Sequence, residues 1–177
     1  MNRRSTIKTL LIFSTGAAVL PSCLQDTEKS SLSLKNLKIN DNEQELLAEL
    51  SETIIPKTDT PGAKDVSAHL FALLMIDDCH APDERDKFAK GLKGFEEFTK
   101  KKFDKSFVKC TRSERAEILK AVESKKDIPG EVTFFYNRMK WLTIQAFTTS
   151  EYYLTKVQVY KLAPGKFYGC VPVKKAS

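Results

Sequence analysis

The spacing of apolar residues constrains the fold of this chain more than any other feature. Apolar residues recur at three and four positions in five successive stretches, which places side chains on one face of an α-helix. Proline, glycine or a capping residue separates most of these stretches. We therefore predict an all-α fold, a single compact helical domain, with helices near residues 43–55, 65–76, 83–103, 112–126 and 131–148.

Turn and capping residues mark several helix ends. Pro56 ends the first helix, and Asp65 is placed to cap the second helix after a turn at Pro61 and Gly62. The sequence TRSE at residues 111–114 matches a capping box, which predicts the start of the fourth helix.

The fifth stretch is apolar on more than one side. One face carries Val132, Phe135, Met139, Leu142 and Ala146, whereas Phe134, Trp141 and Ile144 lie elsewhere around the helix. Such a helix is central to its domain, and its surplus apolar face must be covered by the rest of the chain or by a partner. The third helix carries a mainly aromatic stripe that is expected in the core: Phe88, Leu92, Phe95, Phe98 and Phe103.

The first 22 residues have the organisation of an export signal. Arg3 and Arg4 precede an apolar run, residues 9–20, which is too short to span roughly 30 Å of hydrocarbon as a helix. The paired arginines resemble a twin-arginine signal, which addresses folded proteins to a dedicated translocase. The ending Leu-Pro-Ser-Cys resembles a lipobox, so Cys23 is expected to carry lipid and to begin the mature protein. An ordinary secretory signal with a chance cysteine is the alternative.

Three segments follow from these patterns. Residues 1–22 form the predicted lipoprotein signal peptide, residues 23–42 a polar flexible tether, and residues 43–177 the helical domain. Beyond Ser150 the chain is rich in tyrosine, proline and glycine, a composition that suits an extended aromatic segment on a surface.

Length and charge narrow the class of protein. The 177-residue chain without its first 22 residues fits one domain. Those 22 residues hold three of the 29 basic residues, so 26 basic and 23 acidic residues remain, a net charge of about +3. This balance indicates no nucleic-acid partner.

Few residues offer catalytic or metal-binding chemistry. His69 lies on an apolar helix face, which favours a core role with its hydrogen bonds satisfied. His80 follows two aspartates and Cys79, but the spacing matches no standard metal site, and a c-type haem motif would need cysteine in place of Ile76. We predict no catalytic, cofactor or metal site in this chain.

Three cysteines remain if Cys23 carries lipid: Cys79, Cys110 and Cys170. An odd number in an oxidising compartment is compatible with one internal disulfide, and the sequence leaves all three pairings open.

Three blocks of sequence stand out. They are ETIIPKTDTPGA at residues 52–63, the segment from FF through WLT to FTTS at residues 134–150, and Tyr168-Gly169 before Pro172. Together they resemble the gluconate 2-dehydrogenase subunit 3 family over about residues 46–173. The resemblance implies a helical small subunit, exported by a twin-arginine signal, that pairs with a large flavin-dependent oxidoreductase of the glucose-methanol-choline type, often with a cytochrome c subunit. FAD is then expected in the partner. The lipobox and Cys170 depart from the family pattern.

The same blocks suggest a partner interface. The residues assigned to it are Ile54, Ile55, Pro56, Pro61, Gly62, Phe134, Trp141, Tyr168 and Gly169. The alternative is that these residues only close the helical core.

The leading hypothesis is a non-catalytic small subunit of an envelope sugar or polyol dehydrogenase. It would escort the folded flavin subunit through twin-arginine export and hold it at the periplasmic side of a bacterial membrane through lipid on Cys23. One alternative is a stand-alone envelope lipoprotein that binds a small molecule or polysaccharide in a pocket lined by Phe88, Phe95 and Trp141. A weaker alternative is a metal-dependent enzyme around His80 and Cys110.

Overall fold

The computed structural model describes residues 34–124, 128–158, 160, 161, 163, 165, 166, 169 and 170. The predicted signal peptide and the predictions for Arg3, Arg4, Cys23 and Tyr168 lie outside these residues. The described chain is all-α, as predicted, and contains no strand in these ranges. Its elements are α2 (Asp41–Ile54), α3 (Ala68–Cys79), α4 (Pro82–Phe103), the 3₁₀ turn η2 (Phe107–Lys109), α5 (Arg112–Ser124), α6 (Gly130–Thr148) and the π-helical turn η3 (Tyr153–Val157).

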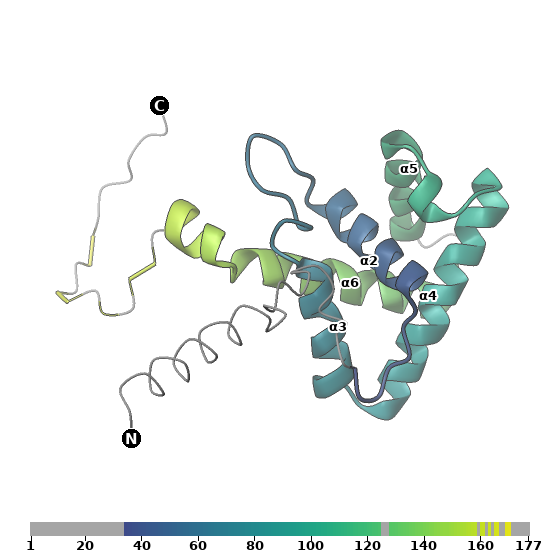
Figure 1. The fold of residues 1–177 in the computed structure, drawn as a ribbon, viewed down its shortest axis with the longest axis horizontal. Coiled ribbons are helices and arrows are strands. Elements are labelled where there is room, and N and C mark those ends of the chain that lie inside the picture. The colour runs from purple at the N-terminus through teal and green to yellow at the C-terminus, as the bar shows by residue number, and fades with distance from the viewer. Residues whose placement is uncertain are drawn as a thin grey trace, which may run out of the picture. The chain divides into compact units, whose positions relative to one another are not determined.

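Helix α6 is the central element, and it packs against α2, α3, α4 and α5 (Figure 1). The predicted inner face is confirmed, because Val132, Phe135, Met139, Leu142 and Ala146 are all buried. Of the apolar residues predicted elsewhere around the helix, Trp141 is 55% exposed and Ile144 is 42% exposed, whereas Phe134 is half-buried. The burial of one apolar face fixes α6 in place and leaves a second apolar surface in water.

Helices α4 and α6 cross at Gly91. A Cβ atom at this position would lie 2.2 Å from the backbone oxygen of Glu131, so glycine permits the close approach. Part of the aromatic stripe of α4 fills the adjacent core: the ring centroid of Phe135 is 5.0 Å from that of Phe88 and 5.6 Å from that of Phe95. Phe98 and Phe103, also expected in the core, are only half-buried. Phe88 and Phe95 are fully buried, whereas Trp141 faces solvent. These three residues therefore do not line one pocket, and the aromatic pocket proposed for a stand-alone lipoprotein is wrong.

The capping box predicted for α5 is confirmed. The backbone N–H of Thr111 donates to Glu114 Oε2 over 2.7 Å, and the backbone N–H of Glu114 donates to Thr111 Oγ1 over 3.4 Å. The cap predicted for the second helix is wrong, because α3 begins three residues after Asp65 and Ser67 precedes it without a side-chain cap. Asp65 instead accepts hydrogen bonds from within the preceding loop.

The segment after Ser150 begins as a helix, whereas the sequence suggested an extended chain. Backbone bonds from Leu154 to Ser150 (3.0 Å) and from Gln158 to Tyr153 (2.9 Å) continue the helical path through η3. Phe147 packs against the rings of Tyr152 and Tyr153, with centroid distances of 6.4 and 6.0 Å. These contacts are short in sequence and hold the turn against the end of α6. No helix among the described residues combines the length and apolar character needed to cross a bilayer.

Candidate functional site

The loop between α2 and α3, residues 55–67, is built around one carboxylate of α2. Glu52 accepts the backbone N–H of Lys57 over 2.7 Å on Oε1 and the backbone N–H of Lys64 over 3.0 Å on Oε2. The two bonds connect both ends of the loop to the last turn of α2. We refer to residues 55–67 as the Pro-Gly loop, and its shape is set by Glu52, a residue that the sequence did not single out on its own.

Gly62 lies directly over this carboxylate. A Cβ atom at Gly62 would stand 2.6 Å from each carboxylate oxygen of Glu52 and 2.6 Å from the backbone nitrogen of Lys57. The backbone N–H of Gly62 donates to Asp65 Oδ2 over 2.9 Å, and Lys57 Nζ donates to Asp65 Oδ1 over 3.0 Å. The bond from Gly62, together with Lys57, lowers the pKa of Asp65. Gly62 is therefore required for the loop to close.

The Pro-Gly loop packs against the C-terminal half of α6. Ala63, Ala68 and Ala146 form a small buried cluster, and the half-buried side chains of Ile55 and Phe71 cover it. The first two blocks of the resemblance thus meet in space. Of the residues assigned to the partner interface, Gly62 is buried, Ile54, Ile55, Pro56 and Pro61 are half-buried, and Gly169 is exposed.

A groove of about 760 Å³ opens beside this contact. One wall belongs to the Pro-Gly loop and the start of α3, and the other belongs to the end of α6 and the turn that follows. The lining is apolar at Val66, Phe71, Ala146 and Tyr152 and carries hydroxyl groups at Ser67, Thr149, Ser150 and Thr155. Such a lining accepts an apolar side chain with polar backbone around it.

The outer face of α6 carries the other two assigned interface residues that the structure describes. Phe134 is covered by cations, because Lys87 Nζ lies 4.8 Å and the Arg138 guanidinium carbon 5.4 Å from the ring centroid. Arg138 is held by Glu84 on α4 through a 3.1 Å ion pair. Trp141 lies two turns further along the same face and is exposed. Apart from Gly169 in the C-terminal segment, the described residues of this set therefore fall into two groups, one at the loop and one on the outer face of α6.

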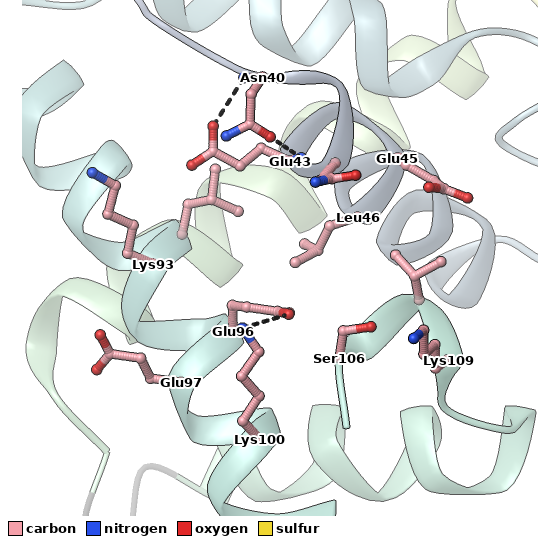
Figure 2. A pocket seen from close by; sticks show the side chains of 13 residues that line it. Asn40, Glu43, Glu45, Leu46, Lys93, Glu96, Glu97, Lys100, Ser106 and Lys109 are labelled. Atoms are coloured by element: carbon pink, nitrogen blue, oxygen red, sulfur yellow. Dashed lines mark hydrogen bonds and ion pairs between the residues drawn. The ribbon is translucent and has the colours of Figure 1, made fainter. Parts of the chain in front are cut away.

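A second cavity, of about 610 Å³, lies between the N-terminal half of α2, the middle of α4 and η2 (Figure 2). Its apolar floor is Leu46, Leu92 and Val108. Several polar groups on its wall already have partners: Glu96 pairs with Lys100 over 3.4 Å and accepts the backbone N–H of Phe107 over 3.3 Å.

Glu49 and Arg115 form an ion pair between α2 and α5. Lys64 Nζ also donates to Glu49, over 2.6 Å, and Arg115 donates to the carbonyl oxygens of Phe107 (3.2 Å) and Val108 (2.6 Å). Burial by itself would raise the pKa of Glu49, but the bonds from Lys64 and Arg115 outweigh it and lower that pKa. The network therefore joins the Pro-Gly loop, α2, α5 and η2.

The N-terminal segment is fastened to α3 by Asp77, which is only 1% exposed. Its carboxylate accepts the backbone N–H groups of Lys35 (2.7 Å), Asn36 (2.8 Å) and Leu37 (2.7 Å). Burial favours a raised pKa, but these donors and the charge of Arg85 outweigh it, so the pKa of Asp77 is lowered.

The predicted tether therefore differs from the structure in its last part. Residues 35–37 are bonded to Asp77 of α3, Asn40 caps α2, and the final two residues of the predicted tether, Asp41 and Asn42, belong to α2.

The described cysteines and histidines do not come together as a metal-binding or catalytic site. Cys79, Cys110 and Cys170 are unpaired, so the structure contains none of the three possible disulfides. His80 Nδ1 lies 3.0 Å from the carbonyl oxygen of Met75. No group of three metal-binding side chains occurs in the part of the chain that the structure describes.

His69 differs from expectation, because its buried Nδ1 has no hydrogen-bond partner among the residues that the structure describes. Burial, assisted by the charge of Lys64, lowers the pKa of His69. A neutral ring at this position is therefore favoured.

Comparisons with known proteins give one positive result. No curated protein and no solved structure shows significant similarity to the chain. The family described as Gluconate 2-dehydrogenase subunit 3 matches residues 41–165, which include every helix from α2 to η3. The chain therefore belongs to the gluconate 2-dehydrogenase subunit 3 family.

Proposed function

We propose that this protein is the non-catalytic small subunit of a flavin-dependent sugar or polyol dehydrogenase of the glucose-methanol-choline type, located in the bacterial envelope. The observation that carries the proposal is the family match over residues 41–165, because the matched description names a subunit of a larger enzyme. FAD belongs to the large partner in this scheme, and a cytochrome c subunit would accept its electrons.

The arrangement of charged groups supports a binding role over a catalytic one. Each carboxylate whose pKa is lowered accepts hydrogen bonds from donors of this chain: Glu49, Asp65, Asp77, Glu114 and Glu123. Groups engaged in this way hold helix ends and loops together. They are poorly placed to exchange protons with a substrate near neutral pH.

The proposed route to the envelope rests on the N-terminal sequence. Arg3 and Arg4 would supply a twin-arginine address for a partner that must fold around its flavin before export. Lipid on Cys23 would then hold the complex at the periplasmic side of the membrane, firmly only if more than one acyl chain is attached. The chain between Cys23 and Lys35 can reach at most about 40 Å when fully extended, which limits the distance between membrane and domain.

The test is purification of the carboxy-terminally tagged full-length chain from its native envelope, followed by mass spectrometry and an absorbance scan. We expect one stoichiometric partner with a flavin spectrum. Changing Arg3 and Arg4 together to lysine should remove both proteins from the envelope fraction, whereas Arg112→Lys, at an exposed position on α5, should not. Recovery of a colourless, still exported chain without a partner would reject the proposal and favour a stand-alone lipoprotein.

Anchoring is tested separately. Cys23→Ser should move the complex from the membrane fraction to the soluble envelope fraction without loss of flavin. Cys170→Ser is the matched control, because this exposed cysteine lies far from the lipobox in sequence. If the Cys23 variant stays in the membrane fraction, something other than lipid on that cysteine holds the complex there.

A further inference from the structure

Exposed large hydrophobic side chains are concentrated in the C-terminal part of the sequence. The described residues contain five of them, and four follow residue 140: Trp141, Ile144, Val157 and Tyr160, with exposures of 55%, 42%, 53% and 59%. The fifth is Leu74 on α3, at 40%. Apolar side chains left in water on one part of a protein mark a surface that another molecule covers.

Part of this surface is rigid. Trp141 and Ile144 are three residues apart and lie on one face of α6. The opposite face is fixed in the core by Met139 and Leu142, both fully buried. Tryptophan on such a support loses little conformational entropy when it is covered, which is one reason that it dominates binding energies at interfaces.

The rest of the surface lies on an arm, residues 151–158, that extends α6, and on Tyr160 and Lys161, which follow the arm in the sequence. Its main packing partner is α6 itself. In Figure 1 the arm continues beyond the other labelled helices. Val157 is exposed at its end, and Tyr152 and Thr155 form one wall of the groove beside the Pro-Gly loop. The arm therefore carries an exposed apolar side chain at its end and also borders the groove, which Lys156 lines as well.

The C-terminal sequence is also strongly basic. Residues 151–177 contain five lysines and one glutamate, a net charge of +4. The chain after residue 22 carries only about +3, so the part before the arm is close to neutral. Lys156 and Lys161 are exposed beside Val157 and Tyr160. A complementary surface would be acidic with apolar depressions.

We infer that the outer face of α6 and the arm form one docking surface, defined by Trp141, Ile144, Val157, Tyr160, Lys156 and Lys161, for an acidic, apolar face of the large flavin-dependent subunit. The inference rests on the proposed function. It assigns contact with the partner to this surface, and it gives the Pro-Gly loop a structural role at the end of α6. An anionic membrane would also attract the lysines. A protein is the favoured partner because Trp141 and Ile144 are held in fixed positions on a core helix.

Photo-crosslinking tests the inference in the native envelope. Benzoylphenylalanine is placed in the full-length chain at position 141 or 157, with position 74 as the matched control for an exposed apolar site. We expect adducts to the flavin-containing subunit from positions 141 and 157, about tenfold more than from position 74, mapped by mass spectrometry to a segment rich in Asp and Glu.

Each result separates the inference from the proposed function. If the flavin subunit copurifies but positions 141 and 157 give no adduct with it, the docking surface is wrong and the function stands. Adducts to phospholipid from both positions would overturn the inference in favour of a membrane surface. If no flavin subunit copurifies with the unmodified chain, the proposed function itself fails.

Charge reversal tests the basic part of the surface. Lys156→Glu with Lys161→Glu should weaken binding of the purified flavin subunit by about tenfold at low salt, with a smaller loss at high salt. Lys90→Glu with Lys120→Glu makes the same change in net charge on α4 and α5 and should leave binding unchanged. Equal losses in the two double variants would show a non-specific charge effect and overturn the inference.

Discussion

The carboxylate of Glu52 occupies the space that a Cβ atom on Gly62 would need. Both oxygens lie 2.6 Å from the ideal Cβ position, and so does the backbone nitrogen of Lys57. The side chain of Glu52 could turn away, but the Lys57 backbone could not move without opening the loop. The close contact links the end of α2 to the loop through one residue that lacks a side chain.

Gly62→Ala should destabilise the protein by about 2 kcal/mol, because the added methyl group overpacks the loop. Gly130→Ala is the control, since nothing lies within 4 Å of a Cβ at that position. It should leave the free energy of unfolding unchanged or raise it by up to about 1 kcal/mol. Urea unfolding of both variants measures the difference. Equal stabilities would refute the contact.

The crossing of α4 and α6 predicts a larger effect. Gly91→Ala should lower the free energy of unfolding by about 3 kcal/mol, because the methyl group meets the Glu131 backbone oxygen and α6 must move. Gly94→Ala should cost about 1 kcal/mol, since its methyl group meets only Val132 Cγ2, at 2.8 Å, and a side chain can adjust. Thermal or urea unfolding would show the order, and a larger loss from Gly94→Ala would contradict it.

Asp77→Asn should release the N-terminal segment while the rest of the domain stays folded. Loss of the charged acceptor should lower the free energy of opening this segment by about 2 kcal/mol. Amide exchange at residues 35–37 should then be roughly 30-fold faster. Asp78→Asn is the control, because the ion pair of Asp78 with Lys35 is exposed and 3.5 Å long, so its loss should change stability little. Hydrogen exchange read by mass spectrometry distinguishes the two variants. Protection at residues 35–37 that survives in Asp77→Asn would disprove the attachment.

Acid should weaken the start of α5. Hydrogen bonds from Lys105, and then from the backbone and side chain of Thr111, lower the pKa of Glu114 from 4.5 to about 2. Because the folded-state pKa is the lower one, this stabilisation is complete above about pH 4.5 and is lost as the pH falls toward 2. The stability difference between the native protein and Glu114→Gln should therefore shrink over that interval in urea titrations. A difference that is constant down to pH 2 would argue against the capping bonds.

The helices could be predicted from the sequence because their signals are local. The inner face of α6 repeats at helical spacing, and the box at Thr111 and Glu114 spans four residues. The arm was not predicted, because the tyrosine- and glycine-rich composition of the C-terminal segment outweighed the few bonds that continue the helix. Asp65 was misassigned, since a loop partner and a helix cap require the same type of residue in nearly the same place.

The attachment at Asp77 was missed for a different reason. The acceptor and its donors are about 40 residues apart, and no periodicity connects them. One signal was available: Asp77 follows Leu73 by four residues and so falls on the buried stripe of α3. A carboxylate on an apolar stripe needs donors from elsewhere. The sequence does not show that backbone N–H groups would provide them.

The Asp77 attachment also determines where mechanical load enters the domain. A pull along the chain that precedes Lys35 reaches α3 first, through three backbone bonds on one carboxylate. The capping box of α2, at Asn40 and Glu43, follows these bonds in the sequence, so it bears no force while they are intact. Tension on the N-terminal segment would therefore have to break the bonds at Asp77 before it could unwind α2.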